Sequence, residues 1–164
     1  MFQRQDSTFI YYKPSSKDSL KYDHSVTGVL QLDDKSLLVA AGKYLSVFDV
    51  YNKSYKSHHT HSPKDTTAQM LYFRDVIKDR KGVFWTTGYG LGQIGSDLNV
   101  IGAYFKNNDH PQQSLSHNQT ESAREDMNGN IWVATYGGGL NKMEPETKTI
   151  RVYTSNDGLA NNFT

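Results

Sequence analysis

The sequence contains no cysteine, only four prolines and no long apolar run. Without cysteine the chain forms neither disulfides nor thiolate metal sites. No apolar stretch is long enough to span a bilayer, and the opening residues MFQRQDSTFIYYK lack the apolar core of a secretory signal peptide. We therefore expect this segment to make no direct contact with a membrane.

The sequence also lacks an excess of charge of either sign. Its 18 basic and 17 acidic residues leave a formal net charge of +1, so no electrostatic footprint points to nucleic acid as a partner. Aromatic residues, in contrast, make up 12% of the chain and include 11 tyrosines. Such a composition suits β-strands and amphipathic surfaces that bind sugars or proteins.

The chain repeats one sequence unit at a constant interval. Trp132 in GNIWVATYGGGL follows Trp85 in GVFWTTGYGLGQI by 47 positions, and Leu38 in KSLLVAAGKYLSVFDV precedes Trp85 by the same interval. The segments TGVLQLDDK, RDVIKDRKG and ESAREDMNG lie before these three residues with the same spacing. Self-similarity at such a period indicates a repeat architecture.

Each repeat reads as four short strands joined by polar turns. In the third copy we expect the strands at 121–126, at 130–135, from about 140 onward and at 149–154. The second strand is apolar at successive residues, so both of its faces should be covered by neighbouring sheets. The fold class predicted is all-β, with about three four-stranded antiparallel β-propeller blades in an incomplete ring.

These residues resemble a known family. The stretch AREDMNGNIWVATYGGGLNKMEPETKTIRVYTSNDGLANN is similar to the two-component regulator propeller repeat, and the second copy keeps its Asp79, Gly82, Trp85 and Thr87. The resemblance is strong from Arg74 onward and weak before it, where Leu38 stands in place of the Trp. It implies a periplasmic sensor region of a hybrid two-component regulator, whose parent carries a histidine kinase and which senses glycan-derived ligands.

The repeat also predicts where units begin and end. We expect both ends of the chain to be cut within a repeat, so that either further blades of a larger sensor or a second copy of the chain completes the ring. The expected units are an orphan outer strand and linker, three blades and the start of a fourth, at 1–24, 25–68, 69–118, 119–160 and 161–164.

The conspicuous glycines of the third copy are expected to form a structural turn. Gly137, Gly138 and Gly139 precede a strand and lack the Lys-Ser/Thr and helix that a phosphate loop needs. The preceding DMNGN resembles the start of a calcium loop, but its twelfth position is Gly137 where a glutamate is required. We expect no metal or cofactor site, and we expect Trp85 and Trp132 to be wedges between blades.

One group of residues is expected to form a binding site for an oligosaccharide or other small ligand. In a propeller the turns between second and third strands and the linkers between blades share one rim. Aromatic faces that stack on sugar rings and side chains that hydrogen-bond hydroxyls would gather there: Lys43, Tyr44, Tyr89, Tyr136, His24, His117 and Asn118. The alternative is that Tyr89 and Tyr136 merely cover the ends of their blades.

Two classes of function remain open at this point. A non-catalytic sensor module agrees with the family resemblance and with the absence of a nucleophile motif. The alternatives are a propeller enzyme of lyase or glycosidase type, for which Arg74, Glu121 and Arg124 are the only candidate residues, and a protein-interaction scaffold.

Overall fold

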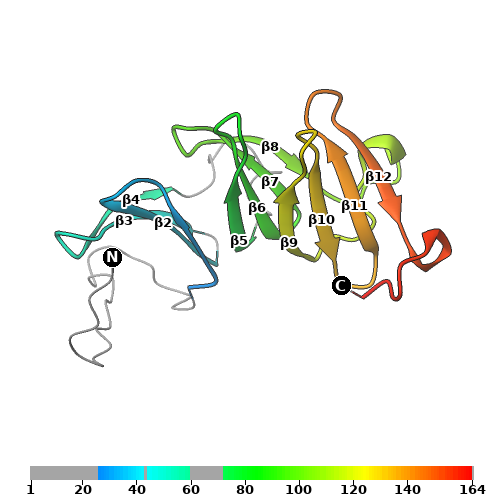
Figure 1. The fold of residues 1–164 in the computed structure, drawn as a ribbon, viewed down its shortest axis with the longest axis horizontal. Helices are drawn as coiled ribbons and strands as arrows, with labels where there is room; N and C mark the ends of the chain where they lie inside the picture. Colours follow the sequence, from blue (N-terminus) through cyan, green and yellow to red (C-terminus); the bar gives the residue numbers. More distant parts are fainter. Residues whose placement is uncertain (1–25, 43, 60–71, 164) are drawn as a thin grey trace.

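The computed structural model describes residues 26–42, 44–59 and 72–163, and there it forms three four-stranded antiparallel sheets (Figure 1). The strands of the first blade are β1 (Gly28–Gln31), β2 (Ser36–Ala41), β3 (Tyr44–Asp49) and β4 (Ser54–His59). Those of the second are β5 (Tyr72–Lys78), β6 (Phe84–Tyr89), β7 (Leu91–Ile94) and β8 (Val100–Tyr104). Those of the third are β9 (Thr120–Glu125), β10 (Ile131–Thr135), β11 (Gly139–Glu144) and β12 (Thr149–Tyr153).

Every sheet pairs its strands in chain order, as a meander, and the first strands β1, β5 and β9 carry the contacts between sheets. The predicted all-β fold of propeller blades is therefore confirmed, and the described residues form no closed ring. The expected strands of the third copy begin and end within one residue of β9, β10 and β12. Apart from two short 3-10 turns, Pro111–Gln113 and Ser155–Asp157, the described residues contain no helix.

The turn between the first two strands is built around one aspartate. Asp79 Oδ1 accepts hydrogen bonds from the backbone N–H groups of Lys81 and Val83, each at 2.9 Å. Its Oδ2 accepts a hydrogen bond from the indole N–H of Trp85 at 2.8 Å. The turn is closed by Gly82, whose φ of +85° is readily adopted only by glycine. The same carboxylate thus fixes the turn and orients the large side chain of the next strand.

The third blade repeats this arrangement with Asp126. Its Oδ1 accepts from the backbone N–H groups of Asn128 and Asn130 at 2.9 Å, and its Oδ2 accepts from the indole of Trp132 at 2.8 Å. In the first blade the corresponding positions are Leu32 and Leu38. Leu38 is fully buried and Leu32 packs against its cluster, so that blade replaces the hydrogen-bonded pair with an apolar one.

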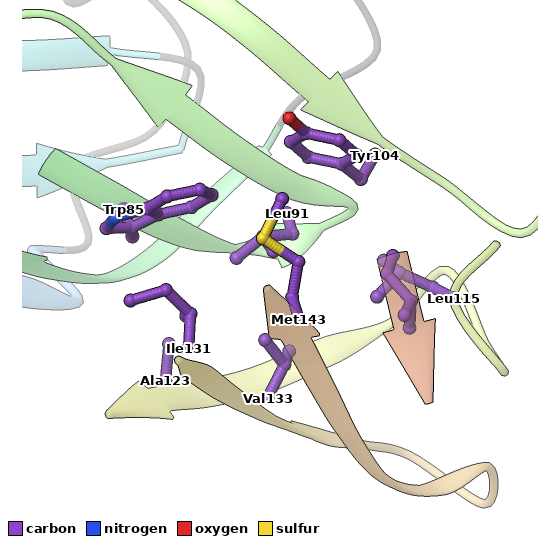
Figure 2. Packing of buried hydrophobic residues seen from close by; sticks show 9 residues of the cluster. Trp85, Leu91, Tyr104, Leu115, Ala123, Ile131, Val133 and Met143 are labelled. Atoms are coloured by element: carbon purple, nitrogen blue, oxygen red, sulfur yellow. The ribbon is translucent and has the colours of Figure 1, made fainter. Parts of the chain in front are cut away.

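Trp85 packs between the second and third blades, as expected of a wedge. It has no exposed surface and belongs to a buried cluster with Ile131, Val133 and Met143 of the third blade (Figure 2). The ring of Tyr104 stacks against it with centroids 6.4 Å apart. Because both faces of β6 are buried, the expectation that neighbouring sheets cover the second strand is confirmed for the second blade.

Trp132 lies at the equivalent place on the third blade, next to Tyr153 at a centroid distance of 5.3 Å. Its face of β10 is only partly buried, because no described sheet packs against it. The expected covering of both faces is therefore not observed for β10, and Trp132 is not a wedge within the described residues. The two tryptophans differ in burial because a neighbouring sheet covers Trp85 and no described sheet covers Trp132, whereas their strands and turns are the same.

Replacing Trp85 with alanine should therefore destabilise the protein more than replacing Trp132. Large-to-small substitutions of buried aromatic residues cost about 3–5 kcal/mol, and the cost falls where solvent already reaches the side chain. Urea unfolding of Trp85→Ala and Trp132→Ala, followed by circular dichroism, measures both. Equal losses would contradict the wedge role of Trp85.

Stability should also decrease in acid through Asp126. Hydrogen bonds from the side chains of Asn130 and Trp132 hold the pKa of its carboxyl well below the ordinary value of 3.8. Below pH 3.8 the unfolded chain therefore binds a proton that the folded chain still excludes, so the stabilisation is present above that pH and is lost as pH falls.

Urea midpoints measured at about pH 5 and about pH 3 should fall less in Asp126→Asn than in the unsubstituted protein. The control is Glu146→Gln, which removes a carboxylate from the solvent-exposed Lys81–Glu146 pair and should retain most of the pH dependence. An unchanged pH dependence in Asp126→Asn would show that this carboxylate is not responsible.

Candidate functional site

A pocket of about 660 Å³ opens on the rim where the second blade joins the linker to the third. Its walls come from the beginning of β5, the end of β6 and the segment between β8 and β9. The lining residues are Tyr72, Arg74, Gly88, Tyr89, Lys106, His117, Asn118 and Gln119. Two phenol rings, amide and imidazole groups and two cationic side chains thus share one cavity.

Tyr89 is the aromatic residue of the expected rim site that also lines the pocket. It ends β6, is 39% exposed, and packs on one side against Phe105 with ring centroids 6.0 Å apart. The preceding Gly88 has φ of +141°, and a Cβ there would lie 1.8 Å from the carbonyl oxygen of Tyr72. Glycine therefore allows β5 and β6 to approach closely and brings Tyr72 and Tyr89 to the same cavity.

The linker wall of the pocket is held by hydrogen bonds that recur in the next repeat. Asn118 Oδ1 accepts from the backbone N–H of Lys106 at 2.6 Å, and the Asn118 carbonyl accepts from Gly90 N at 2.7 Å. Asn162 makes the same two bonds, from Ser155 N at 2.7 Å and Gly139 N at 2.8 Å. Asn118 is therefore a brace of the linker as well as a pocket residue, and its Nδ2 donates to Tyr89 Oη at 3.3 Å.

His117 also supports the linker. Its Nδ1 accepts a hydrogen bond from the backbone N–H of Gln119 at 3.1 Å. In the next repeat the Oδ1 atom of Asn161 accepts from Phe163 N in the same way, at 2.9 Å. The ring orientation of His117 is thus fixed by its own turn.

The charged residues of the pocket are balanced only in part. The guanidinium of Arg74 pairs with the carboxylate of Glu121 on β9, which also accepts from Gln119 Nε2 at 3.1 Å. Lys106 is exposed, and no carboxylate is among the described residues that line the cavity. The cavity consequently has a positive local charge although the whole chain is close to neutral.

The pocket forms at the second blade because the two rim tyrosines have different neighbours. Tyr136, at the place of Tyr89 in the third blade, is 52% exposed and packs edge-to-face on Phe163, with centroids 5.4 Å apart. Phe163 occupies the linker position that Gln119 holds beside Tyr89. We expect the slender amide of Gln119 to leave open the space that the phenyl ring fills in the third blade.

The expected rim site is thus brought together in part. Tyr89, His117 and Asn118 line one cavity. Tyr136 does not line it, and Tyr44 begins β3 and is partly buried elsewhere on the rim. Lys43 and His24 lie outside the residues that the structure describes.

Sequence reasoning missed the other walls of the pocket. Tyr72 and Gln119 occupy the same repeat position, 47 residues apart, so the period itself could have indicated them. Arg74 was considered only for an enzyme, and the sequence carries no signal for Lys106.

The residues considered for an enzyme mediate contacts between blades. Arg74 pairs with Glu121, and Arg124 pairs with Asp75 at 3.1 Å. Arg80–Glu125 at 3.1 Å and Lys81–Glu146 at 2.7 Å extend this series along the junction of the second and third blades. Such exposed pairs contribute little stability each, typically about 0–1 kcal/mol. All four join a residue of the second blade to a residue of the third.

The glycine-rich stretch of the third blade is a turn between strands. Gly137 and Gly139 have φ of +80° and +79°, and a Cβ on Gly139 would lie 2.2 Å from the carbonyl oxygen of Tyr153. The carboxylate of Asp126, the first residue of the calcium-like stretch, is used by its own turn and by Trp132. Across the described ranges no group of three acidic or imidazole side chains is placed to hold a metal ion. The described residues also contain no helix that is long and apolar enough to cross a membrane.

Comparisons with known proteins agree with this architecture. Residues 114–137 match the family model of the two component regulator propeller, so the resemblance drawn from the sequence is confirmed over that stretch. No curated protein matches the chain significantly.

Solved structures share the fold. The extracellular domain described for the hybrid two component system BT3049 of B. thetaiotaomicron is similar with a TM-score of 0.70 and 20% identity, over 87% of this chain and 20% of that one. That of BT4673 from the same organism has a TM-score of 0.61 and 16% identity, over 80% of this chain and 19% of that one. A protein of unknown function from Bacteroides caccae has a TM-score of 0.55 and 18% identity, over 80% of this chain and 47% of that one. The chain spans about a fifth of the length of the first two.

The cause of the cavity can be tested by exchanging the residue that distinguishes the two rims. Gln119→Phe should close the pocket by packing a ring beside Tyr89, as Phe163 packs beside Tyr136. The protein should remain folded, because the third blade carries phenylalanine at this position. A crystal structure of the variant checks this, and a cavity that stays open would contradict the explanation.

Proposed function

Because one of its repeats is a two component regulator propeller repeat, we propose that this chain belongs to the extracytoplasmic sensor region of a hybrid two-component regulator. Its task there is to bind an oligosaccharide in the pocket beside Tyr89. The observation that carries the proposal is the cavity itself, which combines two exposed tyrosines with amide and imidazole groups on the ligand-accessible rim.

The lining suits a sugar. Ligand pockets are typically about 300–1,000 Å³ in volume, and the cavity of about 660 Å³ falls within that range. The phenol rings of Tyr72 and Tyr89 offer apolar faces to the C–H surface of a pyranose. The side chains of Gln119 and His117 offer hydrogen-bonding groups for its hydroxyls.

A sensor also needs binding to influence packing. The pocket draws its walls from the second blade and from the linker that leads directly into β9 of the third. A bound ligand therefore touches both sides of a blade junction and stabilises one relative arrangement of the two sheets. We assign no catalytic role to this segment, because its candidate acid and base residues are engaged in the ion pairs between blades.

Two rim tyrosines provide a matched test. In the full-length protein or this chain, Tyr89→Ala should weaken binding of an oligosaccharide about fivefold or more, since removing an aromatic platform costs about 1–3 kcal/mol. Tyr136→Ala should leave the affinity unchanged, because Tyr136 does not line this pocket.

Isothermal titration calorimetry against a panel of plant and host oligosaccharides measures both affinities. Loss of binding in Tyr136→Ala but not in Tyr89→Ala would move the site away from this pocket. Absence of binding by the entire panel would count against a sugar-binding role.

A further inference from the structure

We propose that the ligand of this pocket carries a negative charge, as a carboxylate or sulfate group on a sugar, and that Lys106 binds that group. The inference rests on the proposed function, since it specifies the chemistry of a ligand in the same cavity. It narrows the expected ligand, an oligosaccharide or other small molecule, to an acidic oligosaccharide.

The charge around the cavity favours an anionic ligand. Arg74 and Lys106 are its only charged lining residues among those that the structure describes. Glu121 neutralises Arg74 from the neighbouring strand, and its other carboxylate oxygen accepts from Gln119. The ammonium of Lys106 is therefore the charge that the described pocket wall leaves unbalanced.

The fold does not require a cation at the position of Lys106. The backbone of Lys106 donates to Asn118 Oδ1, which fixes the start of the linker. In the next repeat Ser155 makes the same bond to Asn162. A serine therefore fulfils the structural role, and the lysine side chain is left for another purpose.

The linker that carries Lys106 is held in place by its own hydrogen bonds and by a buried side chain. Ser114 Oγ accepts from Asn107 N at 2.8 Å, and Leu115 N donates to the carbonyl oxygen of Phe105 at 3.2 Å. The side chain of Leu115 is buried in the cluster around Trp85. The Cα of Lys106 is thus fixed beside the Tyr89–Phe105 pair, and only its flexible side chain must be ordered on binding.

These features together define a mode of recognition. A sugar ring packs on Tyr89, and its anionic substituent accepts a charge-assisted hydrogen bond from the Lys106 ammonium. Arg74 contributes to the pocket wall, and its ion pair with Glu121 keeps it oriented. A neutral sugar of the same shape lacks the ionic contact and leaves the ammonium solvated.

The experiment compares acidic oligosaccharides with neutral counterparts of the same linkage by isothermal titration calorimetry. Suitable probes are oligogalacturonides against galacto-oligosaccharides, glucuronoxylan fragments against xylo-oligosaccharides, and sulfated against unsulfated agarose-type oligosaccharides. The first two pairs test a carboxylate and the third tests a sulfate. At least one acidic member should bind about tenfold or more tightly than its neutral partner, because hydrogen bonds to charged groups are worth about 1.5–3 kcal/mol.

Lys106→Gln should remove this preference and keep the fold, which the urea midpoint verifies. Lys35→Gln, in the exposed turn of the first blade, removes the same charge far along the chain and should preserve the preference. The preference should also decrease when salt is raised to about 0.5 M, because screening weakens an exposed ionic contact.

Equal affinity for neutral and acidic members, or a preference that survives in Lys106→Gln, would overturn this inference. In either case the sugar site stands if Tyr89→Ala weakens binding and Tyr136→Ala does not. If none of the acidic probes binds while a neutral sugar does, the inference also fails, and the proposed function again remains.

Discussion

The hydrogen bond between a turn aspartate and the tryptophan of the following strand organises this protein. In the second and third blades one carboxylate closes the turn and orients an indole six residues later. The indole of Trp85 then fills the space between two sheets, so a local turn becomes a contact between blades. Where the first blade has Leu32 and Leu38, apolar packing replaces this bond and the blade geometry persists.

The pocket arises where the chain departs from its own repeat. The bonds of Asn118 and Asn162 are the same, so the two linkers have one backbone plan. On that plan Gln119 stands where the third blade has Phe163, and Lys106 stands where it has Ser155. Gln119 and Lys106 both line the cavity, so both exchanges fall on its walls. The hydrogen bonds of the linker are the same in both repeats, whereas the side chains at the rim differ. One repeat scaffold can therefore carry different sites.

Positions on the rim could be predicted because propeller geometry gathers turns and linkers from all blades at one end. The structure places Tyr89, His117 and Asn118 around one cavity. The sequence could not show that Asn118 and His117 also brace their own linker through hydrogen bonds. Nor did it show that Tyr89 and Tyr136 have different neighbours.

The sequence by itself determined the strands, the turns and the repeat, because these depend on residues close together in the chain, and the first two strands of each unit recur every 47 positions. It also determined that Trp85 and Trp132 occupy one structural position. Only the tertiary structure decided which tryptophan is enclosed and which tyrosine borders a cavity. Those outcomes depend on groups supplied by another sheet or by a distant linker, and such contacts leave no period in the sequence.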